Sequence, residues 1–329
     1  KVYTYLNFYN GGGVAVGDVN NDGLPDLYFT GNQVPDQLYL NKGNMQFEDV
    51  TAQAKIKNEE GFTLGVSMVD VNGDNLVDIY ICRAGSFEEN SPLLTNQLWI
   101  NQGDMTFKEE AKKRGLADRG RSVHATFFDY DHDNDLDVYV LNHPEDFYAP
   151  VDVRSKLERE RPDRDTDRLY RNDGAGVFTD VKDEAGVRNW GFGLSCTAAD
   201  FNRDGWMDLY IAQDYSERDS YLINQKDGTF QERLFESFMH TSNFTMGADA
   251  ADFNNDGLMD LVTVDMVAED NRRKKANMSG MNPETFWDNV NRGRHYQYMQ
   301  NMLQLNNGNG TFSEIAELAG VAYTDWSWA

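Results

Sequence analysis

Short hydrophobic segments recur along the whole chain and alternate with polar turns that are rich in Asp, Asn and Gly. The segments contain many β-branched and aromatic residues, a composition that favours β-strands. Five of them begin with an aspartate, and they lie at 26–29, 78–81, 137–140, 208–211 and 260–263. No apolar run reaches the length of about 18 residues that indicates a transmembrane helix. The pattern predicts an all-β protein.

A second pattern follows each segment: a short hydrophobic strand, a turn with Asn or Gly, and a strand that begins with Phe. Two strands joined in this way form a β-hairpin. The first strand of each hairpin ends in an asparagine, namely Asn41, Asn101, Asn172, Asn224 or Asn306. From each of the first four asparagines, the chain runs 28 or 29 residues to the first aspartate of the next unit. The other half of the unit varies in length, so insertions are confined to one connection.

The unit repeats every 52 to 71 residues and contains about four strands. This repeat predicts a β-propeller of four-stranded antiparallel blades, because a single blade cannot bury both of its faces. No linker rich in Pro, Ser and Gly interrupts the repeats, so we expect one propeller domain over 1–329. Five blades are covered, and 323–329 is interpreted as the first strand of a sixth blade that is cut before its loop.

Each hydrophobic segment follows an aspartate-rich loop of nine residues, at 18–26, 70–78, 129–137, 200–208 and 252–260. Positions 1, 3, 5 and 9 are always Asp or Asn, and position 6 is Gly or, at Asn75 and Asn134, Asn. Calcium takes six to eight oxygen ligands at about 2.3–2.6 Å, and such a loop offers alternate side chains plus the carbonyl of position 7. Glycine or Asn at position 6 permits the sharp turn that makes these oxygens converge. The loops therefore predict about five Ca²⁺ sites.

The candidate ligands include one backbone carbonyl per loop, at position 7. They are Asp18, Asn20, Asp22, Leu24, Asp26, Asp70, Asn72, Asp74, Leu76, Asp78, Asp129, Asp131, Asp133, Asp135, Asp137, Asp200, Asn202, Asp204, Trp206, Asp208, Asp252, Asn254, Asp256, Leu258 and Asp260. An EF-hand shares the start of this motif but needs a Glu at position 12 and flanking helices. Position 12 is instead Phe29, Ile81, Val140, Ile211 or Thr263, which excludes an EF-hand.

The charge balance limits the class of partner. The chain holds 30 basic and 55 acidic residues, for a net charge of -25. Nucleic acids and anionic membranes need clustered Lys and Arg, so neither is expected as a partner. The loops have the modest charge of extracellular calcium modules, which predicts a secreted or surface protein. Cys82 and Cys196 lie in strands of different blades and are interpreted as buried small hydrophobic residues rather than a disulfide.

Two insertions, at 143–168 and 266–299, fall in the variable connection of the third and fifth units. Both are expected on the same face of the propeller, which is the predicted ligand face because propellers place function in loops. The charged run 162–168 is interpreted as a solvated segment, and a helix is predicted from Pro283 to about Arg292. That helix either caps the propeller or carries a ligand face. The candidate face residues are Phe286, Trp287, His295, Tyr296 and Tyr298.

No catalytic constellation is recognisable. The five histidines show no metal-binding spacing, and no nucleophile elbow or zincin motif occurs. Three functions stay open: a calcium-stabilised binding or adhesion module for a protein or glycan ligand, a glycan-active enzyme or carbohydrate-binding propeller, and a structural subunit of a larger surface complex. A glycosidase would need a pair of carboxylates, but calcium binding already accounts for the regular placement of the carboxylates in this chain.

The segments 11–18, 39–43 and 320–328 resemble the FG-GAP/VCBS repeat propellers, the type found in integrin α-subunits. Within that group it resembles bacterial surface or secreted proteins similar to the cartilage acidic protein family. This resemblance covers nearly the whole chain. It implies about seven blades in the complete protein, calcium at the loop positions given above, and attachment to the cell surface, by lipid for example, through a segment outside this sequence.

Overall fold

A computed structural model describes residues 10–57, 60–86, 88, 91–145, 151–215, 217–277 and 282–326, with only the backbone for 151, 152 and 154. The chain forms two compact units. The first comprises Lys1–Asp183 with Val187–Trp190, and the second comprises Glu184–Gly186 with Gly191–Ala329. No helix of the described residues is long and apolar enough to cross a membrane.

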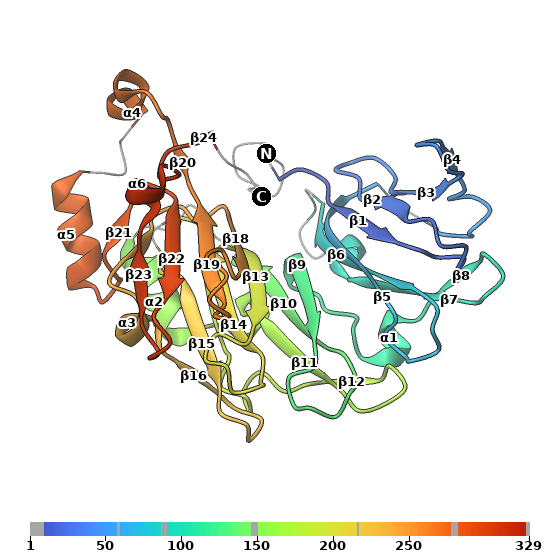
Figure 1. The fold of residues 1–329 in the computed structure, drawn as a ribbon. Coiled ribbons are helices and arrows are strands. Elements are labelled where there is room, and N and C mark those ends of the chain that lie inside the picture. The colour runs from blue at the N-terminus through green and yellow to red at the C-terminus, as the bar shows by residue number, and fades with distance from the viewer. Residues whose placement is uncertain are drawn as a thin grey trace. The chain divides into compact units, whose positions relative to one another are not determined.

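The first unit contains three four-stranded antiparallel sheets in which each strand pairs with the next along the chain (Figure 1). The first sheet is β1 (Val14–Gly17), β2 (Asp26–Phe29), β3 (Gln37–Asn41) and β4 (Phe47–Asp49). The second is β5 (Phe62–Val69), β6 (Asp78–Gly85), β7 (Gln97–Asn101) and β8 (Phe107–Glu109). The third is β9 (Arg121–Phe128), β10 (Asp137–His143), β11 (Arg168–Asn172) and β12 (Phe178–Asp180).

The second unit contains two sheets of the same order. The fourth sheet is β13 (Gly193–Ala199), β14 (Asp208–Gln213), β15 (Ser220–Asn224) and β16 (Phe230–Glu232). The fifth is β18 (Gly247–Ala251), β19 (Asp260–Val264), β22 (Met302–Asn306) and β23 (Phe312–Glu314). These five sheets are β-propeller blades, and the strands predicted from the five aspartate-led segments and the five hairpins are confirmed.

Helices and minor strands occupy the connections. In the first unit these are η3 (Pro92–Leu94), α1 (Ala111–Arg114), α2 (Val151–Glu160) and η4 (Asp163–Asp165). In the second they are α3 (Leu234–Ser237), β17 (Thr241–Ser242), β20 (Met266–Val267), α4 (Asn271–Asn277), α5 (Pro283–Asn291), β21 (Gln297–Tyr298), α6 (Ala316–Ala319) and β24 (Asp325–Trp326). The predicted helix at 283–292 is therefore present as α5, which Asn282 caps by accepting the N–H of Glu284.

The end of the chain pairs outside the five blades. In the segment 323–329, interpreted above as the first strand of a sixth blade, β24 pairs antiparallel with β20 in a separate two-stranded sheet. Residues 327–329 lie outside the described part of the chain. Whether this segment begins a further blade stays a prediction.

Neighbouring blades of the first unit bury each other's apolar faces. One core cluster joins the first and second blades and includes Tyr28, Leu40, Ile79, Ile81 and Trp99. A second cluster joins the second and third blades in the same way. Successive side chains of the middle strand point to opposite faces, so Ile79 and Ile81 of β6 enter the first cluster and Tyr80 and Cys82 enter the second, and the strand is apolar and buried on both faces. Cys82 and Cys196 are buried, as predicted, and do not form a disulfide with each other.

The first blade leaves one apolar face open. Val14 and Val16 of β1 and Phe29 of β2 are 57%, 59% and 41% exposed. Phe29 occupies the same register position as Ile81 of the second blade, since Phe29 pairs with Val14 as Ile81 pairs with Val66. Ile81, however, is fully buried against the first blade. Equivalent residues thus have different exposure because only one of them has a neighbouring blade to pack against.

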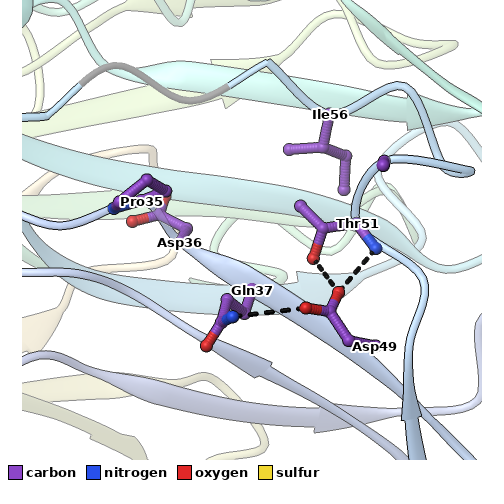
Figure 2. Close-up of a pocket in the computed structure, with 7 residues that line it drawn as sticks. Pro35, Asp36, Gln37, Asp49, Thr51 and Ile56 are labelled. Carbon is purple, nitrogen blue, oxygen red and sulfur yellow. Dashed lines mark hydrogen bonds between the residues drawn. The ribbon is translucent and has the colours of Figure 1, made fainter.

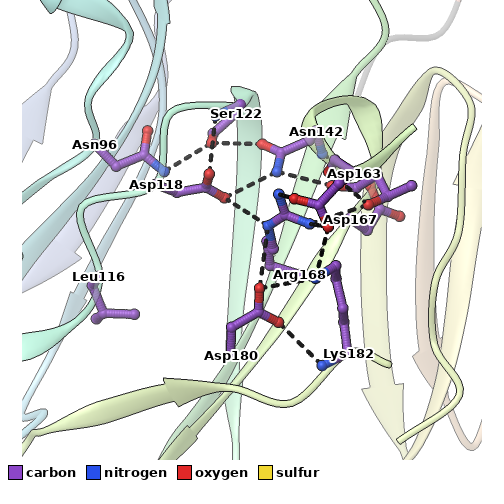
Figure 3. Close-up of polar contacts among 12 residues, drawn as sticks. Asn96, Leu116, Asp118, Ser122, Asn142, Asp163, Asp167, Arg168, Asp180 and Lys182 are labelled. Carbon is purple, nitrogen blue, oxygen red and sulfur yellow. Dashed lines mark hydrogen bonds and ion pairs between the residues drawn. The ribbon is translucent and has the colours of Figure 1, made fainter. Parts of the chain in front are cut away.

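The charged run 162–168 is solvated only in its first part: 162–165 is exposed or half-buried, whereas the interpretation as a solvated segment is wrong for 166–168. Thr166, Asp167 and Arg168 are at most 7% exposed, and Arg168 lies within a network of polar contacts (Figure 3). Arg168 pairs with Asp163 at 3.2 Å and with Asp180 at 3.5 Å. A buried guanidinium needs several carboxylates to offset the loss of hydration, and the distant Asp180 supplies one that the local sequence does not indicate.

Candidate metal centres

The five aspartate-rich loops share one hydrogen-bonding scheme. The position 1 carboxylate binds backbone N–H groups of the turn, as in Asp18, which accepts from Asp22 at 3.1 Å and from Gly23 at 2.7 Å. In the second loop Asp70 accepts from Asp74 and Asn75. Gly23 and Asn75 have φ of 83° and 64°, so position 6 adopts the left-handed conformation that the sequence predicted.

Positions 3, 5 and 7 are coupled in the same way. The side-chain oxygen at position 3 accepts the N–H of position 5 in every loop. The carboxylate at position 5 accepts the N–H of position 7, at Leu24, Leu76, Asp135, Trp206 and Leu258. These bonds use one side of each carboxyl group and hold the oxygens in a fixed arrangement around the turn.

The aspartate at position 9 is fully buried in all five loops, at Asp26, Asp78, Asp137, Asp208 and Asp260. One oxygen accepts the N–H of position 2, and the other accepts the N–H of the hairpin asparagine. In the second loop these bonds run from Val71 at 3.3 Å and from Asn101 at 2.8 Å. Position 9 therefore joins the loop to the third strand of its own blade, whether or not a cation is bound.

The loop at 129–137 has the most favourable arrangement for a cation. One carboxylate oxygen from each of Asp129, Asp131 and Asp137 lies within 4.8 Å of the others, and among the described residues no other group of His, Cys, Asp or Glu converges in this way. The pKa of Asp137 is raised to about 7, chiefly by burial; the N–H groups of Tyr130 and Asn172 oppose the shift, and the charges of Asp131 and Asp133 contribute to it. A bound cation would offset this repulsion.

The remaining loops have Asn at position 3, so fewer carboxylates face one another there. Burial also raises the pKa of Asp78 and Asp208 to about 7 and that of Asp26 above its usual value. In the first and fifth loops Asn20 and Asn254 donate to the carboxylates of Asp22 and Asp256. The donor set of every loop consists of oxygen atoms, which suits Ca²⁺ and fits no soft transition metal.

The predicted ligand face residues are brought together in part. Phe286 and Trp287 of α5 contact each other with ring centroids 5.2 Å apart, and Phe286 lies 6.3 Å from Tyr296 and 5.5 Å from Tyr298. Trp287 and Tyr296 are 55% and 42% exposed. His295 does not belong to this face: it is 5% exposed, and its Nε2 lies 2.8 Å from the carbonyl oxygen of Phe238.

Two further apolar side chains of the second unit are exposed near this group. Phe235 of α3 is 50% exposed and its ring centroid is 4.8 Å from that of His295, which in turn lies 5.9 Å from Tyr296. Met239 is 78% exposed. We call this set the aromatic surface; it comprises Phe235, Met239, Phe286, Trp287, Tyr296 and Tyr298. Sequence reasoning missed Phe235 and Met239 because they precede the insertion by many residues.

The insertion carrying the aromatic surface is tied to the blade core by buried polar contacts. Arg294 and Glu217, which are 4% and 1% exposed, form an ion pair at 3.3 Å. Gln297 donates to the carbonyl oxygen of Glu217 at 3.2 Å, and β21 pairs in parallel with β17. The 143–168 insertion belongs to the first unit, so the prediction that both insertions share a face stays a prediction.

A repeated pair of buried polar residues also escaped the sequence analysis. The tyrosine of the second strand donates its hydroxyl to an Asp two positions before the leucine of the third strand, as in Tyr28 to Asp36 and Tyr139 to Asp167. In the second blade Asn96 replaces the Asp and donates to Tyr80. The signal was available, since Asp or Asn recurs at this position of every unit.

Comparison with known proteins gives consistent results. The FG-GAP-like repeat family matches residues 18–81, 85–140, 161–211 and 200–263, which together exceed half of the chain. Cartilage acidic protein 1 of Xenopus tropicalis is 27% identical over 209 residues, covering 63% of this chain and 29% of that protein. Its counterpart from Mus musculus is 24% identical over 274 residues, covering 79% of this chain and 40% of that protein. The chain thus spans well under half the length of these relatives.

Among solved structures, a lectin of Agrocybe aegerita, described as recognising non-reducing terminal N-acetylglucosamine, aligns with a TM-score of 0.36 at 14% identity. The alignment covers 93% of this chain and 79% of the lectin.

Proposed function

This protein belongs to the FG-GAP-like repeat family, and from that premise we propose that it is a calcium-stabilised extracellular module that binds a protein or glycan through its aromatic surface. The observation that carries the binding role is the aromatic surface itself. Monomeric proteins rarely expose contiguous aromatic and apolar side chains without a partner for them. Trp, Tyr and Phe are also the side chains enriched in binding interfaces.

The aromatic surface has the rigidity that recognition requires. Its insertion is held by the buried Arg294–Glu217 pair and by the β17–β21 pairing, so its rings lose little conformational freedom when a ligand binds. Arg218 lies 5.3 Å from the ring centroid of Phe235 and adds a cation at the edge of the surface. A flat sugar face and an apolar protein side chain are both suited to such rings.

Calcium has a structural role in this proposal. The oxygens at positions 1, 3, 5, 7 and 9 of each loop would hold the ion, and in the third loop Asp129, Asp131 and Asp137 already converge. A bound Ca²⁺ supplies the positive charge that offsets carboxylate repulsion in the turn. Loops without a bidentate Glu at position 12 suit calcium concentrations near 10⁻⁴–10⁻³ M, the range of extracellular modules. The similarity to cartilage acidic proteins supports the same extracellular compartment.

Binding by the aromatic surface is tested with the whole chain on an array of defined glycans and on a panel of purified extracellular matrix proteins, in about 1 mM calcium. Trp287→Ala and Tyr296→Ala should each lose most of the signal while retaining the wild-type melting temperature. Leu318→Ala is the matched control, because Leu318 is an apolar residue of the same unit that is 86% exposed on α6. If both aromatic variants bind like the control, the aromatic surface is not the recognition site.

A further inference from the structure

Each blade of the first unit has an equivalent position beside the start of its third strand and the end of its fourth strand. In the third blade this position is filled by charged side chains (Figure 3). Arg168 lies 3.2 Å from Asp163 and 3.5 Å from Asp180, and Lys182 Nζ lies 3.0 and 3.1 Å from the same two carboxylates. The long basic side chains and their partners occupy the space between the strands.

The second blade has different residues at the equivalent positions. Leu98 pairs with Tyr80 as Leu169 pairs with Tyr139, so Gln97 corresponds to Arg168. By the same register Ala111 corresponds to Lys182, because Trp99 pairs with Glu109 as Tyr170 pairs with Asp180. Replacing an arginine and a lysine by shorter, neutral side chains leaves the position unfilled. A pocket of about 380 Å³ lies there, a size in the usual range of small-molecule sites.

The charge of this second-blade pocket is opposite to that of the whole chain. Among the residues that the structure describes, its lining includes Lys57, Arg83 and Lys112 against one acid, Glu109, whereas the chain carries a net charge of -25. Lys57 and Lys112 are exposed, and neither forms an ion pair with the residues that the structure describes. Glu109 is partly engaged, since its Oε1 accepts the N–H of Ala111 at 2.9 Å. The pocket therefore favours an anion.

A buried donor without a partner lies in the wall of the same pocket. Trp99 lines it, is 4% exposed, and its Nε1 has no hydrogen-bond acceptor in the protein. In the third blade the equivalent Tyr170 has a partner, because its hydroxyl bonds the carboxylate of Asp118. A buried donor left unpaired is costly, so the second blade lacks an acceptor that the third blade has.

We propose that the second-blade pocket binds a carboxylate-bearing sugar, a hexuronate. The carboxylate provides the negative charge that the exposed Lys57 and Lys112 favour, beside Arg83, which is 6% exposed and also interacts with Asp36. The amide of Gln97 and the carboxylate of Glu109 match sugar hydroxyls. The volume exceeds what an isolated carboxylate group needs, which favours a sugar over the tip of an acidic side chain.

The first blade provides an internal contrast. Its equivalent pocket, of about 460 Å³, is lined by Pro35, Asp36, Gln37, Asp49, Thr51, Ala52 and Ile56 (Figure 2). Asp49 accepts hydrogen bonds from Thr51 and Gln37, and no basic side chain is part of the lining. A hexuronate should therefore avoid this pocket. The inference rests on the first unit alone and does not depend on the aromatic surface.

The proposal is tested by ligand-observed NMR and tryptophan fluorescence on the whole chain at constant calcium, with D-glucuronate, D-glucose and N-acetyl-aspartate as probes. Glucuronate should bind saturably at one site, and the other two probes should bind at least about tenfold more weakly, since only glucuronate offers both a carboxylate and hydroxyls. Equal binding of glucose would overturn the charge argument. Equal binding of N-acetyl-aspartate would assign the pocket to acidic side chains instead of sugars.

Variants locate the site. Lys112→Ala should weaken glucuronate binding about fivefold or more, whereas Lys113→Ala should leave it unchanged, because Lys113 pairs with Glu110 outside the pocket. Gln97→Arg with Ala111→Lys reproduces the side chains of the third blade and should abolish binding. Because Ala111 is 1% exposed, a thermal melt establishes that this variant is folded. Glucuronate binding that survives in a folded Gln97→Arg/Ala111→Lys protein, or that Lys112→Ala leaves intact, would overturn the proposal.

Discussion

Asn101 donates a hydrogen bond from Nδ2 to the backbone carbonyl oxygen of Val19, 2.8 Å away, and thereby joins the second blade to the aspartate-rich loop of the first. The same bond joins Asn172 to Val71 and, in the second unit, Asn306 to Phe201. The backbone N–H of each asparagine also donates to the buried position 9 aspartate, as that of Asn101 does to Asp78. The hairpin asparagine therefore connects a loop, a strand and the neighbouring blade.

Removing this connection should destabilise the fold. Asn101→Ala leaves the carbonyl oxygen of Val19 buried without this donor, and we expect a loss of about 1–3 kcal/mol in the free energy of unfolding. Asn41→Ala is the matched control, because Asn41 Nδ2 bonds Pro25 within its own blade and is more exposed. Urea unfolding of both variants measures the difference. Equal losses would show that the contact between blades contributes nothing.

Equivalent apolar residues of the first two blades differ in burial by a neighbouring blade. Replacing them by alanine should therefore lower the free energy of unfolding by different amounts. Ile81→Ala should cost about 2–5 kcal/mol, since Ile81 is fully buried in the cluster between the first two blades. Phe29→Ala, at the same register position of the first blade, should lower the free energy of unfolding by less than about half of the Ile81→Ala loss, because Phe29 is 41% exposed. The midpoints of chemical unfolding give both values. A larger loss for Phe29 would mean that another surface covers the first blade in solution.

Calcium should raise the melting temperature of the protein. Ligand binding to the folded state alone stabilises it by about 2.7 kcal/mol per site at a hundredfold excess over Kd. Thermal melts in about 1 mM calcium and in a chelator measure this effect, with magnesium as the control for ionic strength. Superimposable calcium and chelator melts would contradict the assignment of calcium to the loops.

The third loop should bind calcium most tightly, because Asp129, Asp131 and Asp137 converge there. Asp131→Asn makes position 3 like that of the other four loops and should weaken one site about tenfold while the remaining sites are unchanged. Calorimetric titration resolves this loss. Asn202→Asp is the reverse change in the fourth loop and should strengthen one site. An unaltered isotherm for both variants would contradict the dependence on carboxylate number.

Stability should depend on pH through the buried Asp219, which accepts bonds from Tyr210 at 2.6 Å and Thr245 at 3.0 Å. Burial raises the pKa of Asp219 to about 7, whereas an unfolded Asp has a pKa near 3.9. Between these values the folded state keeps a proton that the unfolded state has lost. This stabilising contribution is therefore complete below about pH 4 and disappears as the pH rises through about 7.

The test is the unfolding free energy at several pH values in the presence of a chelator. Asp219→Asn should reduce the loss of stability between pH 5 and pH 7, whereas Asp227→Asn, at an exposed turn, should follow the wild type. An identical pH dependence in the Asp219 variant and the wild type would show that this carboxyl group is ionised in the folded protein.

The sequence by itself determined the blades and their loops because both depend on local patterns. Short segments rich in β-branched and aromatic residues, bounded by turn residues, define strands, and the spacing of Asp18, Asp22 and Asp26 defines a turn within nine residues. The α5 helix was predictable for the same reason, since its Asn282 cap and Pro283 start are adjacent in the chain.

Only the tertiary structure decided which charged and aromatic residues are buried. Arg168 belongs to a run that reads as solvent-exposed, yet it is buried beside Asp180 and Asp118, which are supplied by other segments of the chain. His295 is flanked by exposed residues but its Nε2 contacts the carbonyl oxygen of Phe238. The pocket at Lys112 and Trp99 is equally invisible in the sequence, because a cavity depends on the volumes of side chains that meet from distant segments.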